Sequence, residues 1–248
     1  GVIIVAKKGV ERMEALGTSN LLLIRLDRDG NIVWSKLVGG KQYYYLISPQ
    51  SVTQISDGNY LISAETFTEQ SKKDGVLMKI NSNGEILWSR TIGSKENNER
   101  FRASIQTENN TYITVGDLYN YNVSQGFLIE IDESGNILNS KNVGSSNNGE
   151  VNRLDTILST SDNSYLISGK TNSYGAGGFD NIVIKINKDL IGNRCSIISD
   201  ISNLLISKEV PQSSSISLDI APFMGIADNL NLKVENISNL ETSLICPK

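Results

Sequence analysis

The amino-acid sequence predicts an all-β protein made of consecutive four-stranded antiparallel sheets, and two repeated patterns carry this prediction. The first pattern is a hairpin, clearest in VLMKINSNGEILWSRTIG (residues 76–93), where apolar and polar residues alternate on both sides of an Asn-Ser-Asn-Gly turn. Such alternation around a turn with Gly in its left-handed position is typical of a β-hairpin. Near copies occupy residues 21–40 and 127–145, and a copy at residues 181–193 has lost the Gly turn.

A second pattern, a strand, a turn and a strand, lies between the copies of the hairpin. It spans residues 51–66, 102–117 and 154–171, and each copy carries a tyrosine at the same position. Two positions before each tyrosine is a residue that tolerates positive φ, as the turn requires. These turn residues and their tyrosines are Gly58 and Tyr60, Asn110 and Tyr112, and Asn163 and Tyr165. Both patterns recur roughly every 50 residues, which indicates a solenoid, a propeller or an array.

The two patterns divide most of the chain into four units. We expect these units at about residues 1–40, 41–94, 95–145 and 146–195, with the first unit lacking its opening strand. Their strands are apolar on both faces, as in Leu22 to Ile24 and Ile182 to Ile184. A sheet buried on both faces needs a neighbour on each side, which the stacked blades of a propeller supply. The sequence therefore predicts a β-propeller of about four blades, each a four-stranded antiparallel sheet.

Charged and aromatic residues recur at fixed positions in the hairpins. One charged position lies two residues before each turn, occupied by Arg25, Lys79, Glu130 and Lys185. It marks either an exit to solvent at a rim or central channel, or a simple solvated strand end. Trp34 and Trp88 share a position in the fourth strand, where the third unit has Asn139. We expect each Trp to fill the space between neighbouring sheets.

The repeats resemble those of secreted and surface-exposed bacterial and archaeal β-propeller proteins, which are built of roughly 50-residue tandem units. The resemblance rests on DGNYLIS (57–63), DGVLMKINSNGEILWSRTIGS (74–94) and TNSYGAGGFDNIVIKIN (171–187). It covers Gly1 to about Cys195 and implies an architecture and a location outside the cell more than an activity. The chain departs from the pattern at Asn139, which replaces the Trp, and at Leu190, which replaces the turn Gly.

Residues 196–248 form a tail of different character. The tail alternates like β-strands but contains neither repeat, so we expect a β-rich extension that closes a ring or forms a cap. Cys195 and Cys246 bracket it, as in the ends of archaeal members of the group that it resembles. Two cysteines fit a disulfide in an oxidising compartment, which we predict, and two buried free thiols are the alternative.

The strand that begins the chain, GVIIVAKK, leaves an unpaired edge, and such edges are normally covered. Residues 214–220 and 230–237 of the tail are the candidate strands to cover it. The tail either closes a ring within its own molecule or adds a strand to a neighbouring subunit. Sequence that precedes Gly1 is the third explanation.

Composition excludes several classes of protein. The net charge is −4 and there is no basic stripe, which argues against a nucleic-acid partner. The apolar runs are too short for a transmembrane segment. Histidine is absent, which removes the commonest general base and metal ligand. We therefore expect neither an enzyme nor a bound cofactor or metal.

Weaker motifs each have a simpler explanation. The turns that begin at Asp27 and Asp132 resemble the start of a calcium loop, but the twelfth residue of such a loop, counted with Asp27 as the first, is Val38 and not an acid. The glycines of residues 175–178 precede a strand, which fits a loop better than a phosphate cradle. Three carboxylates are candidates for a glycosidase pair, with turn or surface roles as the alternative. They are Asp117, Asp155 and Asp180.

Three N-glycosylation sequons, at Asn109, Asn122 and Asn236, favour an extracellular or cell-surface location. The first functional hypothesis is a structural or adhesive interaction platform, a subunit of a surface assembly or filament. Its partners would be other surface proteins or copies of the chain itself. The second hypothesis is a carbohydrate-binding or carbohydrate-cleaving propeller.

Overall fold

The protein is an all-β chain in the part that the computed structural model describes. Every regular element of that part is a strand, so the predicted absence of helix holds for these residues. None of it is a helix with the length and hydropathy that a membrane span requires. The described residues are 1–8, 20–38, 48–67, 73–94, 97–120, 123–144, 147, 149–175, 177–190, 198–200, 205–207 and 213–215.

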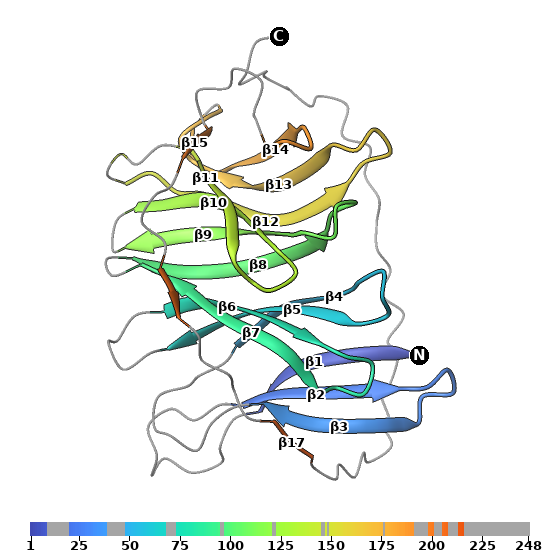
Figure 1. Cartoon of the computed structure of the whole chain (residues 1–248). Helices are drawn as coiled ribbons and strands as arrows, with labels where there is room; N and C mark the ends of the chain where they lie inside the picture. The colour runs from blue at the N-terminus through green and yellow to red at the C-terminus, as the bar shows by residue number, and fades with distance from the viewer. Residues whose placement is uncertain are drawn as a thin grey trace, which may run out of the picture.

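Four antiparallel sheets follow one another along the chain (Figure 1). The first sheet orders its strands as β1 (Val2–Lys8), β2 (Asn20–Leu26), β3 (Ile32–Val38) and β17 (Ser213–Ser215). The second has the order β4 (Ser48–Gln54), β5 (Tyr60–Phe67), β6 (Lys73–Ile80), β7 (Ile86–Gly93) and β16 (Leu205–Ser207). The third has β8 (Asn98–Gln106), β9 (Tyr112–Asn120), β10 (Val123–Ile131), β11 (Ile137–Val143) and β15 (Ile198–Asp200). The fourth contains β12 (Asn152–Ser159), β13 (Tyr165–Thr171) and β14 (Asp180–Ile186).

The hairpin turns form as their sequences predict. Between β6 and β7, the Gly84 amide donates to the Asn81 carbonyl at 2.9 Å, and Gly84 has a φ of 74°. The turns of the second pattern also have positive φ, including 60° at both Asn110 and Asn163. The last hairpin turn keeps this geometry without Gly, because Leu190 has a φ of 55° and a buried side chain. A left-handed residue with a β-carbon costs about 1–2 kcal/mol, which the burial of the leucine offsets.

The sheets stack face to face, and a hydrophobic cluster fills each space between them. We call the face that a sheet turns toward the preceding sheet its N-side face, and the opposite face its C-side face. The C-side face of the first sheet, with Leu21 and Leu23, packs on the N-side face of the second, with Val76 and Met78. The same arrangement joins the second sheet to the third and the third to the fourth. Trp34 and Trp88 pack against the first two clusters, as predicted.

The tail runs back along the stack and pairs with the outermost strand of three successive sheets. Strand β15 pairs with the end of β11, β16 with the end of β7, and β17 with the end of β3. The expected pairing of the tail with the chain's first strand is wrong for β17, which lies at the opposite edge of the first sheet from β1. Residues 216–220 and 230–237 lie outside the described residues. Within the described part, the tail pairs with its own chain. It covers the edge formed by the last strand of each sheet and not the edge formed by the first strand.

The first and fourth sheets lie at opposite ends of the stack (Figure 1). No hydrogen-bonded strand pair joins these two sheets among the described residues. The all-β fold is therefore confirmed, and so are the four antiparallel strands expected in the second and third units, to each of which a tail strand is added. The fourth sheet contains three described strands. The arrangement of the sheets as the blades of a closed propeller stays a prediction.

Candidate interaction site

A β-bulge recurs in the first strand of the second, third and fourth sheets. The strand register shifts between Pro49 and Ser51 in β4, between Phe101 and Ala103 in β8, and between Leu154 and Thr156 in β12. A bulge re-aims the side chain of the extra residue. The extra residues are Gln50, Arg102 and Asp155. The repeat thus places three different polar side chains at one position of three consecutive sheets.

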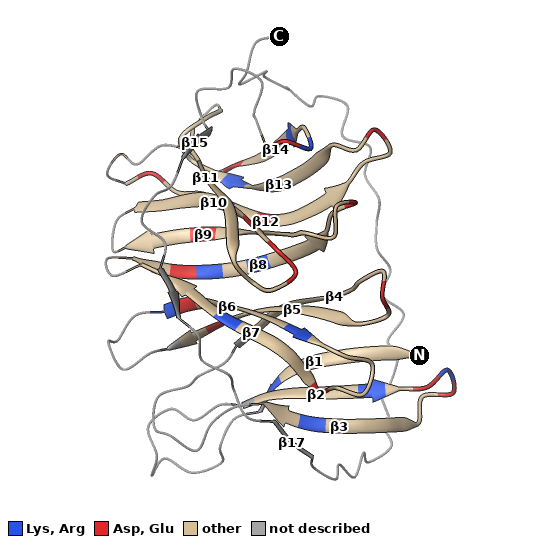
Figure 2. Ribbon diagram, viewed as in Figure 1, with Lys and Arg blue, Asp and Glu red and all other residues tan. Residues whose placement is uncertain are grey.

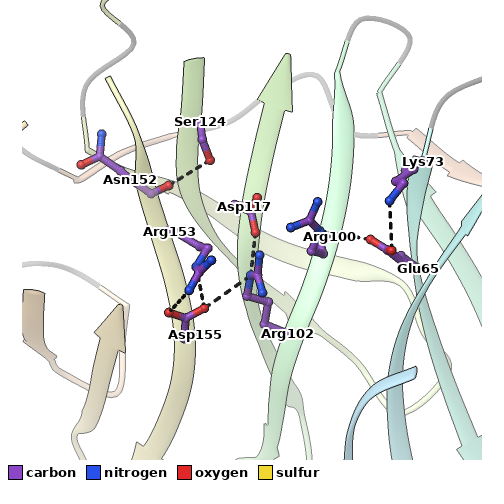
Figure 3. A network of polar contacts seen from close by, with 9 residues as sticks. All are labelled: Glu65, Lys73, Arg100, Arg102, Asp117, Ser124, Asn152, Arg153 and Asp155. Atoms are coloured by element: carbon purple, nitrogen blue, oxygen red, sulfur yellow. Dashed lines mark hydrogen bonds and ion pairs between the residues drawn. The ribbon is translucent and has the colours of Figure 1, made fainter. Parts of the chain in front are cut away.

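Arg102 connects the third sheet to the fourth (Figure 3). Its Nε lies 2.7 Å from Asp117 Oδ1 on β9 and 3.5 Å from Asp155 Oδ1 on β12. Arg153 donates to the other oxygen of Asp155 at 2.9 Å. The Asp117 side chain is only 5% exposed, and a carboxylate buried to this extent needs a partner of opposite charge. Arg102 is that partner. Figure 2 shows the basic and acidic segments next to each other on β8 and an acidic segment on the adjacent β9.

Glu65 forms the second half of this polar network and connects the second sheet to the third. Its carboxylate accepts from Lys73 Nζ and from Arg100 Nε, both at 3.1 Å. The Arg100 guanidinium also lies 4.7 Å from the ring centroid of Tyr119, within cation–π range. Partial burial works to lower the pKa of Arg100, but Tyr119, Asp117 and Glu65 outweigh it and raise that pKa above its ordinary value.

The chemistry of the network favours structure over catalysis. Asp117 and Asp155, two of the three predicted candidate carboxylates, do come together, but one guanidinium lies between them. The Arg102 guanidinium occupies the space between the two carboxylates, where a glycosidase would hold the bond that it cleaves. The third candidate, Asp180, lies at the start of β14 beside Gly175 and takes no part in these contacts. Arg102 Nη2 is buried without a hydrogen-bond partner among the described residues.

In the first two sheets, the fixed charged position of the hairpins connects neighbouring sheets, whereas Glu130 and Lys185 bond within their own sheets. Lys79 is 12% exposed, and its Nζ lies 2.9 Å from Asp57 and 3.0 Å from the Tyr112 hydroxyl on the next sheet. Burial works to lower the pKa of Lys79, but the hydrogen bonds to Tyr112 and Asp57 raise it overall. Arg25 likewise donates to the Ser82 carbonyl on the next sheet at 2.5 Å. The sequence had suggested either an exit to solvent at a rim or central channel or a solvated strand end, and both interpretations are wrong for the mostly buried Lys79.

The remaining predicted site residues fall into two groups. Asn109 is exposed in the turn between β8 and β9, where a glycan acceptor would be accessible. Asp27 serves its own turn, because one carboxylate oxygen accepts from the amides of Asp29 and Asn31 at 2.9 Å. The other predicted residues lie outside the described part of the chain: Cys195, Cys246, Asn122 and Asn236.

The ion pair between the third and fourth sheets could have been predicted by comparing equivalent positions of the repeat, which inspection of single strands and turns does not do. Arg100-Phe-Arg102 and Arg153-Leu-Asp155 begin the equivalent strands of two consecutive units. Alignment of the repeats would have placed one basic and one acidic residue at the same bulge on adjacent sheets. Glu65 and Lys73 had no comparable signal.

Comparison with known proteins assigns no family to the chain. No protein-family model matches it, and no curated protein matches it significantly. No cluster of three or more Asp, Glu, Cys or His side chains suited to a metal ion occurs within the described residues.

Proposed function

We propose that the protein is a non-catalytic interaction platform of the cell exterior, built of propeller-type blades, and a subunit of a surface assembly. The polar network supports this proposal, because its carboxylates are used to connect neighbouring sheets. The exposed sequon at Asn109 supports an extracellular location. Other surface proteins and further copies of the chain are the proposed partners.

A row of exposed aliphatic side chains carries the proposal. Val33, Leu87 and Leu138 occupy the same repeat position on β3, β7 and β11, and they are 56%, 49% and 55% exposed. Neighbouring sheets pack about 10 Å apart, so this aliphatic row spans roughly 20 Å. Single exposed apolar residues are ordinary, whereas a row repeated on three adjacent outer strands is typical of an interaction surface.

The strand edges beside the aliphatic row are also open. The tail strands pair only with the ends of the outer strands, from Lys36, Thr91 and Lys141 onward. In the described part of the chain, no strand pairs with the outer edge next to Val33, Leu87 or Leu138. An open edge beside aliphatic side chains can accept an extended segment of a partner by β-augmentation.

Binding of surface proteins to immobilised chain tests the proposal. The comparison is between the wild type and a triple variant with Val33→Ser, Leu87→Ser and Leu138→Ser, probed with proteins extracted from the outside of the source cell. We expect saturable binding to the wild type and at least about tenfold weaker binding to the variant, since each aliphatic side chain contributes on the order of 1 kcal/mol. Equal binding to both would refute the role of the row.

A carbohydrate-binding function is the second candidate, and one partly exposed group of side chains in the polar network favours it. Arg153 and Asp155 are each 33% exposed, and they adjoin the unpaired Nη2 of Arg102. Planar polar groups of this kind can bind sugar hydroxyls. Binding to a glycan array that is lost in Asp155→Ala but kept in the triple serine variant would favour this candidate. Hydrolysis of any glycan by the wild type would contradict the non-catalytic proposal.

A further inference from the structure

The repeat makes each face of a sheet predictable from its neighbours. In all three internal interfaces, the C-side face of one sheet packs on the N-side face of the next. The stack therefore ends in one N-side face, on the first sheet, and one C-side face, on the fourth. Among the described residues, no sheet packs on either of these two end faces (Figure 1).

The N-side end face is apolar and exposed where its internal counterparts are buried. Val2 and Ile4 of β1 are 58% and 40% exposed, whereas Ile62, which corresponds to Ile4 in the second sheet, is 1% exposed. Strand β2 contributes three apolar residues to the same face: Leu22, Ile24 and Leu26. These three are partly exposed, whereas their counterparts in the second sheet are buried: Val76, Met78 and Ile80. This face has the composition of an internal interface without the neighbour.

The C-side end face shows the same contrast. Val183 is 65% exposed, whereas Leu77 and Leu128, at the same repeat position, are 0% and 2% exposed. Leu158 on β12, two strands away in the same sheet, is 58% exposed. The prediction that both faces of this sheet are buried is therefore wrong for Val183 in the described structure.

The C-side end face carries an exposed lysine, Lys185, that could donate a hydrogen bond to a neighbouring sheet. Lys185, the last residue at the fixed charged position of the hairpins, is 53% exposed and pairs only with Asp162 of its own sheet among the described residues. In the first interface, the equivalent Arg25 donates to the carbonyl of Ser82 in the hairpin turn of the following sheet. The first sheet has Arg28 at the turn position that corresponds to Ser82. A first sheet placed after the fourth would present the carbonyl of Arg28 to Lys185.

We propose that the C-side end face of one molecule packs on the N-side end face of a second copy, so that copies associate head to tail. The proposal rests on the proposed function as a subunit of a surface assembly, and it supplies the contact between subunits. The contact repeats the geometry of the three internal interfaces, with Val183 and Leu158 against Val2 and Ile4. Because the two faces differ, the contact is heterologous and builds a ring or a filament.

The size of the contact sets the expected affinity. Three strands of seven residues offer a face of about 14 Å by 23 Å. A face of this size, roughly 300 Å², is smaller than the roughly 800 Å² that each partner buries in a standard interface, so we expect weak association, at concentrations on the order of 100 µM.

Sedimentation of two blocked variants tests the proposal. Ile4→Glu blocks the N-side end face, and Val183→Glu blocks the C-side end face. Wild type should grow beyond a dimer as its concentration rises, and each variant alone should stay monomeric. An equimolar mixture of the variants should form dimers and nothing larger, because one intact face of each kind remains. Leu138→Glu, which lies in the aliphatic row and on neither end face, is the matched control and should assemble like the wild type.

Other outcomes overturn the inference. A Val183→Glu variant that still dimerises would show that like faces pair, and a wild type that stays monomeric up to about 1 mM would show that no copy binds there. Circular dichroism and unchanged thermal transitions must show that both variants fold. The proposed function is tested separately by Leu87→Ser with Leu138→Ser, because these two residues lie on the second and third sheets and the double variant leaves both end faces intact.

Discussion

Gly75 and Phe101 should be energetically coupled, because they face each other between the second and third sheets. Phe101 is fully buried, and its ring centroid lies 5.5 Å from that of Phe127. A β-carbon added at Gly75 would lie 2.6 Å from Cζ of the Phe101 ring, which is too close for contact without movement. The absence of a side chain at Gly75 is therefore what allows the phenylalanine to fill this space.

The magnitudes follow from this geometry. Gly75→Ala should lower the free energy of unfolding by about 1–3 kcal/mol through overpacking. Phe101→Ala should lower it by about 3–5 kcal/mol through the cavity that it leaves. Once the ring is gone, the added methyl group has room, so the double variant should be about 2 kcal/mol more stable than the sum of the single effects implies.

Urea unfolding, followed by circular dichroism, measures the four free energies of this cycle. Gly126 provides a matched control, since it has the same repeat position but faces Leu154 across the next interface. Gly126→Ala and Phe101→Ala act on opposite faces of the third sheet, so their effects should add to within about 0.5 kcal/mol. Additivity of Gly75→Ala with Phe101→Ala would refute the packing of the second sheet on the third.

Three further predictions concern other parts of the stack. Tyr112→Phe removes the hydroxyl that accepts from Lys79 and should cost about 1 kcal/mol in urea unfolding; no loss would show that Asp57 alone satisfies the lysine. Hydrogen bonds from Asn31, chiefly from its side chain, hold the pKa of Asp27 below 3.8 in the folded state. The ionised carboxylate therefore stabilises the fold above pH 3.8, and this stabilisation is lost as the pH falls through the pKa that Asp27 has in the folded state. Asp27→Asn should therefore flatten the decline of stability below about pH 4, and an unchanged acid profile would contradict this role. Deletion of residues 196–248 removes β15, β16 and β17 and uncovers the ends of three outer strands. The truncated chain should therefore aggregate, which size-exclusion chromatography would detect. An unaltered monomer would show that the tail strands do not protect these strand ends.

The sequence by itself determined the local structure of the strands and turns. Alternation with a period of two and turn residues suited to positive φ are local properties, and Gly84, Asn110 and Asn163 adopt the φ values that their positions require. The repeat also determined that the sheets are alike, because equal patterns fold into equal hairpins. Even Leu190 keeps the turn geometry without the glycine.

Only the tertiary structure decided how the sheets contact one another. Arg102 and Asp155 are far apart in the chain, and the stacking of the third sheet on the fourth brings them within 3.5 Å. The sequence also left open which edge the tail covers, since three-residue strands have no periodicity to read. Leu77 and Val183 occupy the same repeat position, yet one is buried and the other exposed. Their difference arises because burial depends on whether another sheet lies against that face, which is a property of the stack and not of the repeat.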